Sequence, residues 1–154
     1  MDFQPLPKDE PIRSVIKAAF DADLPVSGGW GYDKNDAMRL EALPPGHSVT
    51  QTEHMLASMR TYLEMHLTLP KETRYGSINL NETERETIEE ESGVWHRVVY
   101  QVDAMKERDY ESLIEEYKKG YGKEDFDIEA HFRKRKEATL HRMITVWFYS
   151  LFSK

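Results

Sequence analysis

The sequence predicts an α+β fold, in which a small antiparallel sheet is covered by about four helices; an all-α bundle is the alternative. A turn signal at residues 91–93 precedes a run rich in β-branched and aromatic residues, so residues 86–105 are expected to form a β-hairpin. Helices and strands also follow one another without the βαβ rhythm of a parallel sheet. This order favours antiparallel strands with helices packed on one side.

The first helix is predicted to begin at Pro11, because proline suits the first helical position and apolar residues recur behind it at helical spacing. It should end before Pro25. The three glycines in residues 28–31 then disfavour both helix and strand. We expect an irregular loop there, in which Trp30 and Tyr32 fold back onto the body of the protein.

Residues 37–43 are predicted to form a short strand, and Ser48 or Thr50 can cap a second helix behind it. Residues 61–69 carry two patterns at once. Apolar and other residues alternate strictly there, as in a strand, yet a set that begins in the second helix also fits helical spacing: Met55, Met59, Tyr62 and His66. We favour a strand over residues 61–69, because the alternation is complete and Pro70 closes it.

The second arm of the hairpin should place alternate residues on one face, namely Val94, His96, Val98, Tyr100 and Val102. Asp109 then caps an acidic-to-basic helix that stops at Gly120. A last helix is expected from about Ile128 to Phe152.

A chain of 154 residues has the length of one domain, so we expect a single globular domain over residues 1–154. With 39% hydrophobic and 32% charged residues, it is too apolar for disorder and suits a water-exposed surface. The N-terminal residues do not resemble a signal peptide, and the longest apolar run, ten residues from Met143, is too short for a membrane span of about 20. We therefore expect a cytoplasmic protein with no membrane partner. The absence of cysteine also fits the reducing cytoplasm.

Acidic residues outnumber basic ones by 28 to 21, and the net charge of −7 opposes diffuse attraction to nucleic acid. A basic run at residues 133–136 breaks this pattern. Its side chains point around most of a helical turn, so we expect them to pair with the glutamates of residues 82–91 or to form a solvated face, rather than a nucleic-acid surface. A small anionic or aromatic ligand is the other possible partner of this run.

The glycine-rich loop matches neither the P-loop nor the dinucleotide-binding pattern, so we do not expect it to bind a nucleotide through either motif. No cofactor is predicted. Its aromatic residues and the cationic residues elsewhere instead suggest a ligand site. The candidate ligand-binding residues are Trp30, Tyr32, Arg60, His131 and Arg135.

No sequence motif compels a reaction, and neither a nucleophile elbow nor a zinc-binding pattern is present. Asp127 and His131 are four residues apart, but the histidines of that segment are too far apart around a helix to share a metal, so no metal site is predicted. The candidate acids and bases are His54, His96, His131, Glu53 and Asp127.

The C-terminal run from Met143 to Phe152 is more apolar than one buried helical stripe requires. This excess predicts a homodimer in which Trp147 and Phe148 of the C-terminal helix form the interface. For function, the sequence favours a non-enzymatic ligand-binding or protein-interaction module. The alternative is a small hydrolase or lyase that uses histidine and carboxylate side chains, with or without a metal.

Overall fold

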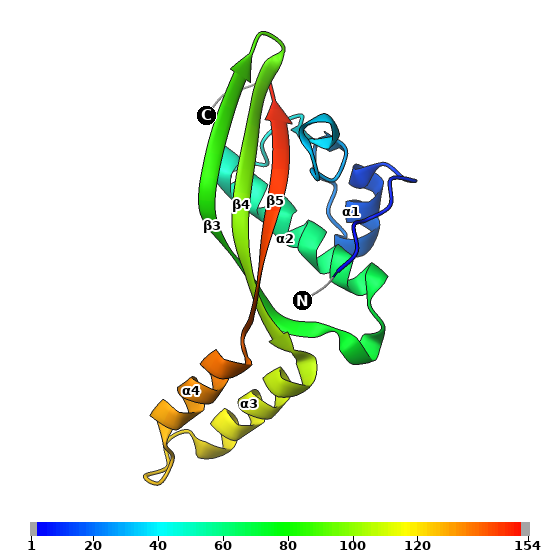
Figure 1. Cartoon of the computed structure of the whole chain (residues 1–154). Helices are drawn as coiled ribbons and strands as arrows, with labels where there is room; N and C mark the ends of the chain where they lie inside the picture. Colours follow the sequence, from blue (N-terminus) through cyan, green and yellow to red (C-terminus); the bar gives the residue numbers. More distant parts are fainter. Residues whose placement is uncertain (1–2, 152–154) are drawn as a thin grey trace.

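The computed structural model describes residues 3–151 and shows an α+β fold (Figure 1). Within that range it has four α-helices, two short 3-10 helices and one five-stranded sheet, which confirms the predicted class and rules out the all-α alternative. The elements are, in order, α1 (Ile12–Phe20), β1 (Val26–Gly28), η1 (Lys34–Asp36), β2 (Met38–Leu40), α2 (Val49–Thr68), η2 (Lys71–Thr73), β3 (Tyr75–Glu90), β4 (Gly93–Lys106), α3 (Glu107–Gly120), α4 (Ile128–Ala138) and β5 (Leu140–Ser150).

The strand order in the sheet is β1-β2-β5-β4-β3. Neighbouring strands are antiparallel except β2 and β5, which run parallel, so the sheet is mixed rather than purely antiparallel. The predicted hairpin is formed by β3 and β4, and its first strand begins earlier than expected, at Tyr75. α3 and α4 follow β4 in the chain and project from the end of the sheet opposite the β3–β4 turn (Figure 1).

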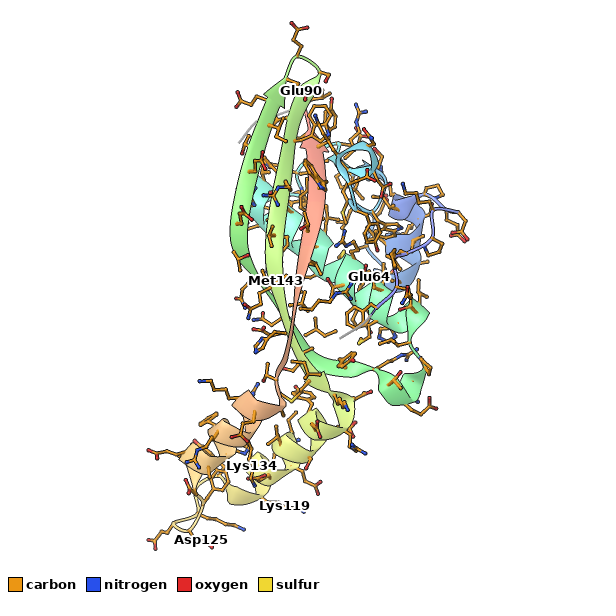
Figure 2. All side chains as sticks on the ribbon, viewed as in Figure 1. Glu64, Glu90, Lys119, Asp125, Lys134 and Met143 are labelled. Carbon is orange, nitrogen blue, oxygen red and sulfur yellow. The ribbon has the colours of Figure 1, made fainter. Side chains whose placement is uncertain are left out.

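The core face of the sheet is built largely by alternate residues of β4. Figure 2 shows Glu90 at the β3–β4 turn and Asp125 at the far tip of the α3–α4 pair, with most side chains gathered between the sheet and α1 and α2. The predicted alternation along β4 is confirmed, since Val94, His96, Val98, Tyr100 and Val102 are all buried. This face shares one apolar core with residues of the two N-terminal helices, among them Ile16 and Leu56.

Residues 61–69 are not a strand, because α2 continues without a break from Val49 to Thr68. A capping box starts the helix: the Ser48 hydroxyl accepts a hydrogen bond from the Gln51 amide, and the Gln51 side chain accepts one from the Ser48 amide. The buried residues of α2 recur at helical spacing, but many are polar: Thr52, Glu53, Arg60, Thr61 and Glu64. The strand prediction was wrong because these polar residues hide the helical period of the buried face from a count of apolar residues.

The chain after Thr139 is also extended, so the predicted helix from Ile128 to Phe152 is wrong beyond Ala138. β5 pairs along its whole length with β4, and Phe148 at 1% exposure lies in the core while Trp147 points to the opposite, partly exposed face. The apolar residues of this run therefore divide between the buried core face and a second, partly exposed face, on which Met143 is 55% exposed. An interface made by a C-terminal helix is therefore wrong; the homodimer itself stays a prediction, and Phe152 lies outside the described residues.

The glycine-rich loop is irregular from Gly29 onward, whereas Gly28, predicted to be irregular too, ends β1. The loop packs tightly against β5. A Cβ atom on Gly31 would lie 2.7 Å from the Trp147 carbonyl oxygen, and the backbone φ of Gly31 is +83°. The Gly31 carbonyl also accepts a hydrogen bond from the Trp147 amide at 2.8 Å. This close approach carries Trp30 into the core, where it is 2% exposed.

Candidate functional site

α3 and α4 form an antiparallel pair whose local sequence sets both ends. Acidic residues in the first turn of α3 and lysines in its last turn complement the helix dipole. α3 ends at Gly120, where a side chain would collide with the Phe126 ring, since a Cβ there would lie 2.1 Å from it. Asp127 caps α4 by accepting a hydrogen bond from the Ala130 amide at 3.0 Å.

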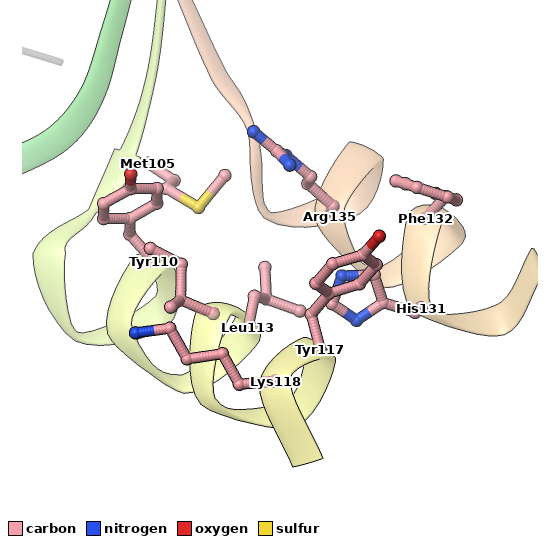
Figure 3. A pocket seen from close by; sticks show the side chains of 9 residues that line it. Met105, Tyr110, Leu113, Tyr117, Lys118, His131, Phe132 and Arg135 are labelled. Carbon is pink, nitrogen blue, oxygen red and sulfur yellow. The ribbon is translucent and has the colours of Figure 1, made fainter. Parts of the chain in front are cut away.

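A cavity of about 380 Å³ lies between these two helices and the end of β4 (Figure 3). Its walls are mostly apolar or aromatic, with two cationic side chains and one histidine among them. The lining residues are Met105, Tyr110, Leu113, Ile114, Tyr117, Lys118, His131, Phe132 and Arg135. We call this site the α3–α4 cavity.

His131 is the only buried side chain of α4, at 2% exposure, and no described residue of α3 is buried. Its ring lies among aromatic neighbours, with centroid distances of 5.4 Å to Tyr117, 5.7 Å to Phe126 and 5.5 Å to Phe132. The His131 Nδ1 atom is buried and finds no hydrogen-bond partner within residues 3–151. The nearest carboxylate oxygen, on Glu116, lies 3.6 Å away, which is too far for a hydrogen bond.

Two cations reach the α3–α4 cavity from opposite helices, Lys118 from α3 and Arg135 from α4 (Figure 3). Neither forms an ion pair with another of the described residues. The neighbouring Lys134 does, but its partner is Glu116 of α3 at 3.4 Å. The predicted pairing of the basic run with the glutamates of residues 82–91 is therefore wrong. Glu82, Glu84 and Glu86 pair with Arg85 or Arg97, and Glu90 pairs with Lys34.

A second cluster lies at the start of α2 and joins candidates that are distant in the chain. The fully buried carboxylate of Glu53 accepts a hydrogen bond from His96 Nδ1 at 2.6 Å and one from Arg85 Nη1 at 2.8 Å. Arg85 also reaches the more exposed Glu82 at 2.6 Å. Burial lowers the pKa of the Arg85 guanidinium, but hydrogen bonds to Glu82 and Glu53 outweigh it and raise that pKa above its usual value.

A third cluster lies inside the core and contains three of the sequence candidates. Arg60 donates to the Trp30 carbonyl and the Thr145 carbonyl, each at 3.2 Å, and its guanidinium lies 4.4 Å from the Tyr32 ring centroid. The Tyr32 hydroxyl donates to Glu64 at 2.6 Å. Burial lowers the pKa of Arg60, whereas burial and the Glu64 carboxylate raise the pKa of Tyr32.

The five ligand-binding candidates thus fall in two separate places. Trp30, Tyr32 and Arg60 contact one another in the core, while His131 and Arg135 line the α3–α4 cavity. Sequence reasoning missed Lys118 and Tyr117 of that cavity. Both belong to α3, and nothing in the sequence indicated that α4 would leave a space beside them.

Of the catalytic candidates, only Glu53 and His96 meet. His54 Nε2 is hydrogen-bonded to the Leu80 carbonyl at 2.9 Å, and Asp127 serves as the cap of α4. Arg85, the third member of the cluster, was not among the predicted site residues. It lies inside an acidic run, a pattern typical of a solvent-exposed strand face.

Within residues 3–151, no three histidine, aspartate or glutamate side chains converge in a geometry that could hold a metal ion. None of the helices in the same range combines the length and the apolar character that crossing a membrane demands.

Compared with known proteins, the chain matches no protein family, no curated protein and no solved structure.

Proposed function

We propose that the protein binds a small organic anion with an apolar body in the α3–α4 cavity. The observation that carries the proposal is that His131 lines the cavity and that its buried Nδ1 atom has no hydrogen-bond partner among the described residues. A buried polar atom without a partner destabilises a protein by about 1–3 kcal/mol. A ligand that hydrogen-bonds with this nitrogen removes that penalty, so binding is favoured.

The size and lining of the cavity support a small-molecule ligand. Its volume of about 380 Å³ falls within the roughly 300–1,000 Å³ of typical ligand sites. Leu113, Ile114 and Phe132 supply apolar walls, while polar groups are few. Such a lining favours a ligand whose body is a short alkyl chain or a small ring.

The charges at the cavity support an anionic head group. Lys118 and Arg135 have no carboxylate partner within residues 3–151, so both can interact with a ligand carboxylate. The arginine fork can bind both oxygens of a carboxylate. Because both side chains are exposed, their contribution should weaken as salt is added.

The same cavity gives little support to catalysis. Its lining includes no serine, threonine or cysteine, and no carboxylate lies within hydrogen-bond distance of His131 to orient the ring. The α3–α4 cavity therefore supports binding rather than turnover.

Octanoate tests the proposal, with 1-octanol as the matched neutral compound. At 100 times its Kd, octanoate should raise the free energy of unfolding of the full chain by about 2.7 kcal/mol. This stabilisation should appear as a higher Tm. Calorimetry should give a Kd for 1-octanol about tenfold weaker, which is ~1.4 kcal/mol, because the alcohol cannot pair with a cation.

Variants on α4 supply the control. Arg135→Ala should weaken octanoate binding, while Arg133→Ala, the same change two residues away and outside the lining, should leave it unaltered. No Tm shift with octanoate, equal affinity for the alcohol, or equal effects of the two variants would each contradict the proposal.

A further inference from the structure

We propose that a separate cavity at the start of α2 is a hydrolytic site for small neutral carboxylic esters, with His96 as the general base. This activity goes beyond the proposed binding function and depends on none of its residues. The cavity measures about 370 Å³ and is lined by residues of α2, β3 and β4, including His96 and Arg85. It lies toward the β3–β4 turn, away from the α3–α4 pair.

The hydrogen bond between Glu53 and His96 sets the state of the imidazole ring. One Glu53 oxygen accepts from Arg85 and the other lies against His96 Nδ1, so this carboxylate can accept the Nδ1 hydrogen and leave Nε2 as the basic nitrogen. Nε2 makes no hydrogen bond within residues 3–151, and the ring, 7% exposed, belongs to the cavity wall. A histidine oriented by a buried carboxylate in this way is arranged to remove a proton from water.

The first turn of α2 supplies donors for the negative charge that develops during the reaction. The Gln51 amide is already bonded to Ser48, but the amides of Val49 and Thr50 make no backbone hydrogen bond among the described residues. Both residues line the cavity, at the positive end of a 20-residue helix. These two amides can stabilise an oxyanion, whereas all three side-chain nitrogens of Arg85 already donate to Glu53 and Glu82.

The reaction balances with water as the only co-reactant. His96 Nε2 takes a proton as the water oxygen attacks the acyl carbon, and the tetrahedral oxyanion faces the α2 amides. The bond between the acyl carbon and the leaving oxygen then breaks, and the imidazolium returns its proton to that oxygen. One ester and one water give one carboxylic acid and one alcohol.

The charges around the cavity select against anionic substrates. Glu53 and Glu82 together outweigh the single positive charge of Arg85, and Glu89 adds a further negative charge to the lining. Val49 and Val94 provide an apolar wall for the acyl group. A small neutral ester therefore fits better than a phosphate or a carboxylate.

The test measures kcat/KM of the full chain with methyl 4-acetoxybenzoate and with 4-acetoxybenzoate, which differ by one negative charge. We expect the neutral ester to be the better substrate. His96→Gln should lower its kcat/KM by roughly 10²-fold, and His141→Gln, which removes an exposed histidine on the other face of the sheet, should not. The exposed histidine controls for hydrolysis by any imidazole group.

Two further variants separate catalysis from stability. Glu53→Gln should lower kcat and leave KM unchanged, because Glu53 positions His96 and does not touch the substrate. Thr50→Trp fills the cavity from an exposed position, so the variant should fold and yet lose turnover. It keeps the proposal testable if His96→Gln does not fold. Equal turnover by the wild type and either the His96 or the Thr50 variant, or a preference for the anionic ester, would overturn the proposal.

Discussion

Glu53 and His96 stand 43 positions apart in the chain, yet their side chains form a 2.6 Å hydrogen bond beneath the sheet. Glu53 is completely buried, and its second oxygen is held by Arg85 at 2.8 Å. Both oxygens of this buried carboxylate are therefore hydrogen-bonded, which offsets the cost of removing it from water.

Glu53→Ala should destabilise the protein by about 3–5 kcal/mol, since it leaves Arg85 and His96 without their buried partner. Glu82→Ala is the matched control, because Glu82 binds the same arginine but is 33% exposed. Its loss should cost less than about 1 kcal/mol. Urea unfolding of the three proteins gives the two differences, and similar values for both variants would show that burial is not the deciding factor.

Tyr32→Phe should cost about 1–3 kcal/mol, because the Tyr32 hydroxyl donates to buried Glu64 and accepts from the Leu6 amide. Tyr100→Phe should cost almost nothing, since the Tyr100 hydroxyl is buried and finds no partner within residues 3–151. Thermal unfolding distinguishes the two variants. A larger loss for Tyr100→Phe than for Tyr32→Phe would contradict this reading of the contacts.

Stability should fall as the pH rises above about 10, the ordinary pKa of tyrosine. Burial first, and the nearby Glu64 or Glu53 carboxylate second, raise the folded-state pKa of Tyr32 and Tyr100. Since each pKa is higher in the folded than in the unfolded chain, the stabilisation is complete below the unfolded value and is lost as the pH rises toward the folded value. Tyrosinate absorbance should show two of the eight tyrosines ionising late in the native protein and with the rest in urea.

Gly31→Ala should destabilise far more than Gly46→Ala, although both glycines have a positive φ, +83° and +78°. At Gly46 the added methyl group meets open space, so only the backbone cost of about 1 kcal/mol remains. At Gly31 it also collides with the Trp147 carbonyl oxygen, which should add about 1–3 kcal/mol. Chemical unfolding measures both, and equal costs would mean that the loop can move away from β5.

His131→Leu should separate binding from stability in the α3–α4 cavity. The change removes a buried nitrogen that has no partner, so the free energy of unfolding should stay the same or rise by about 1 kcal/mol. The affinity for octanoate should fall, because the ligand loses its hydrogen bond. Calorimetry and urea unfolding test both effects; a clear loss of stability would show that His131 is a structural residue.

The sequence by itself determined the parts of the fold whose signals are local. The strict alternation from Val94 to Val102 matches the two faces of β4, and Ser48, one of the two predicted caps, starts α2. Local patterns succeed here because side-chain direction in a strand and hydrogen bonding at a helix start depend on a few neighbouring residues.

The tertiary structure alone decided the rest. The run in β5 is apolar enough for a helix or a strand, and pairing with β4 makes it extended. The second half of α2 buries Arg60 and Glu64, whose partners come from other segments. Because these buried residues are polar, the hydrophobic pattern predicted a strand where the chain is helical. The cavities and the Glu53–His96 contact likewise depend on residues brought together from distant positions, and a single sequence does not encode those distances in any local pattern.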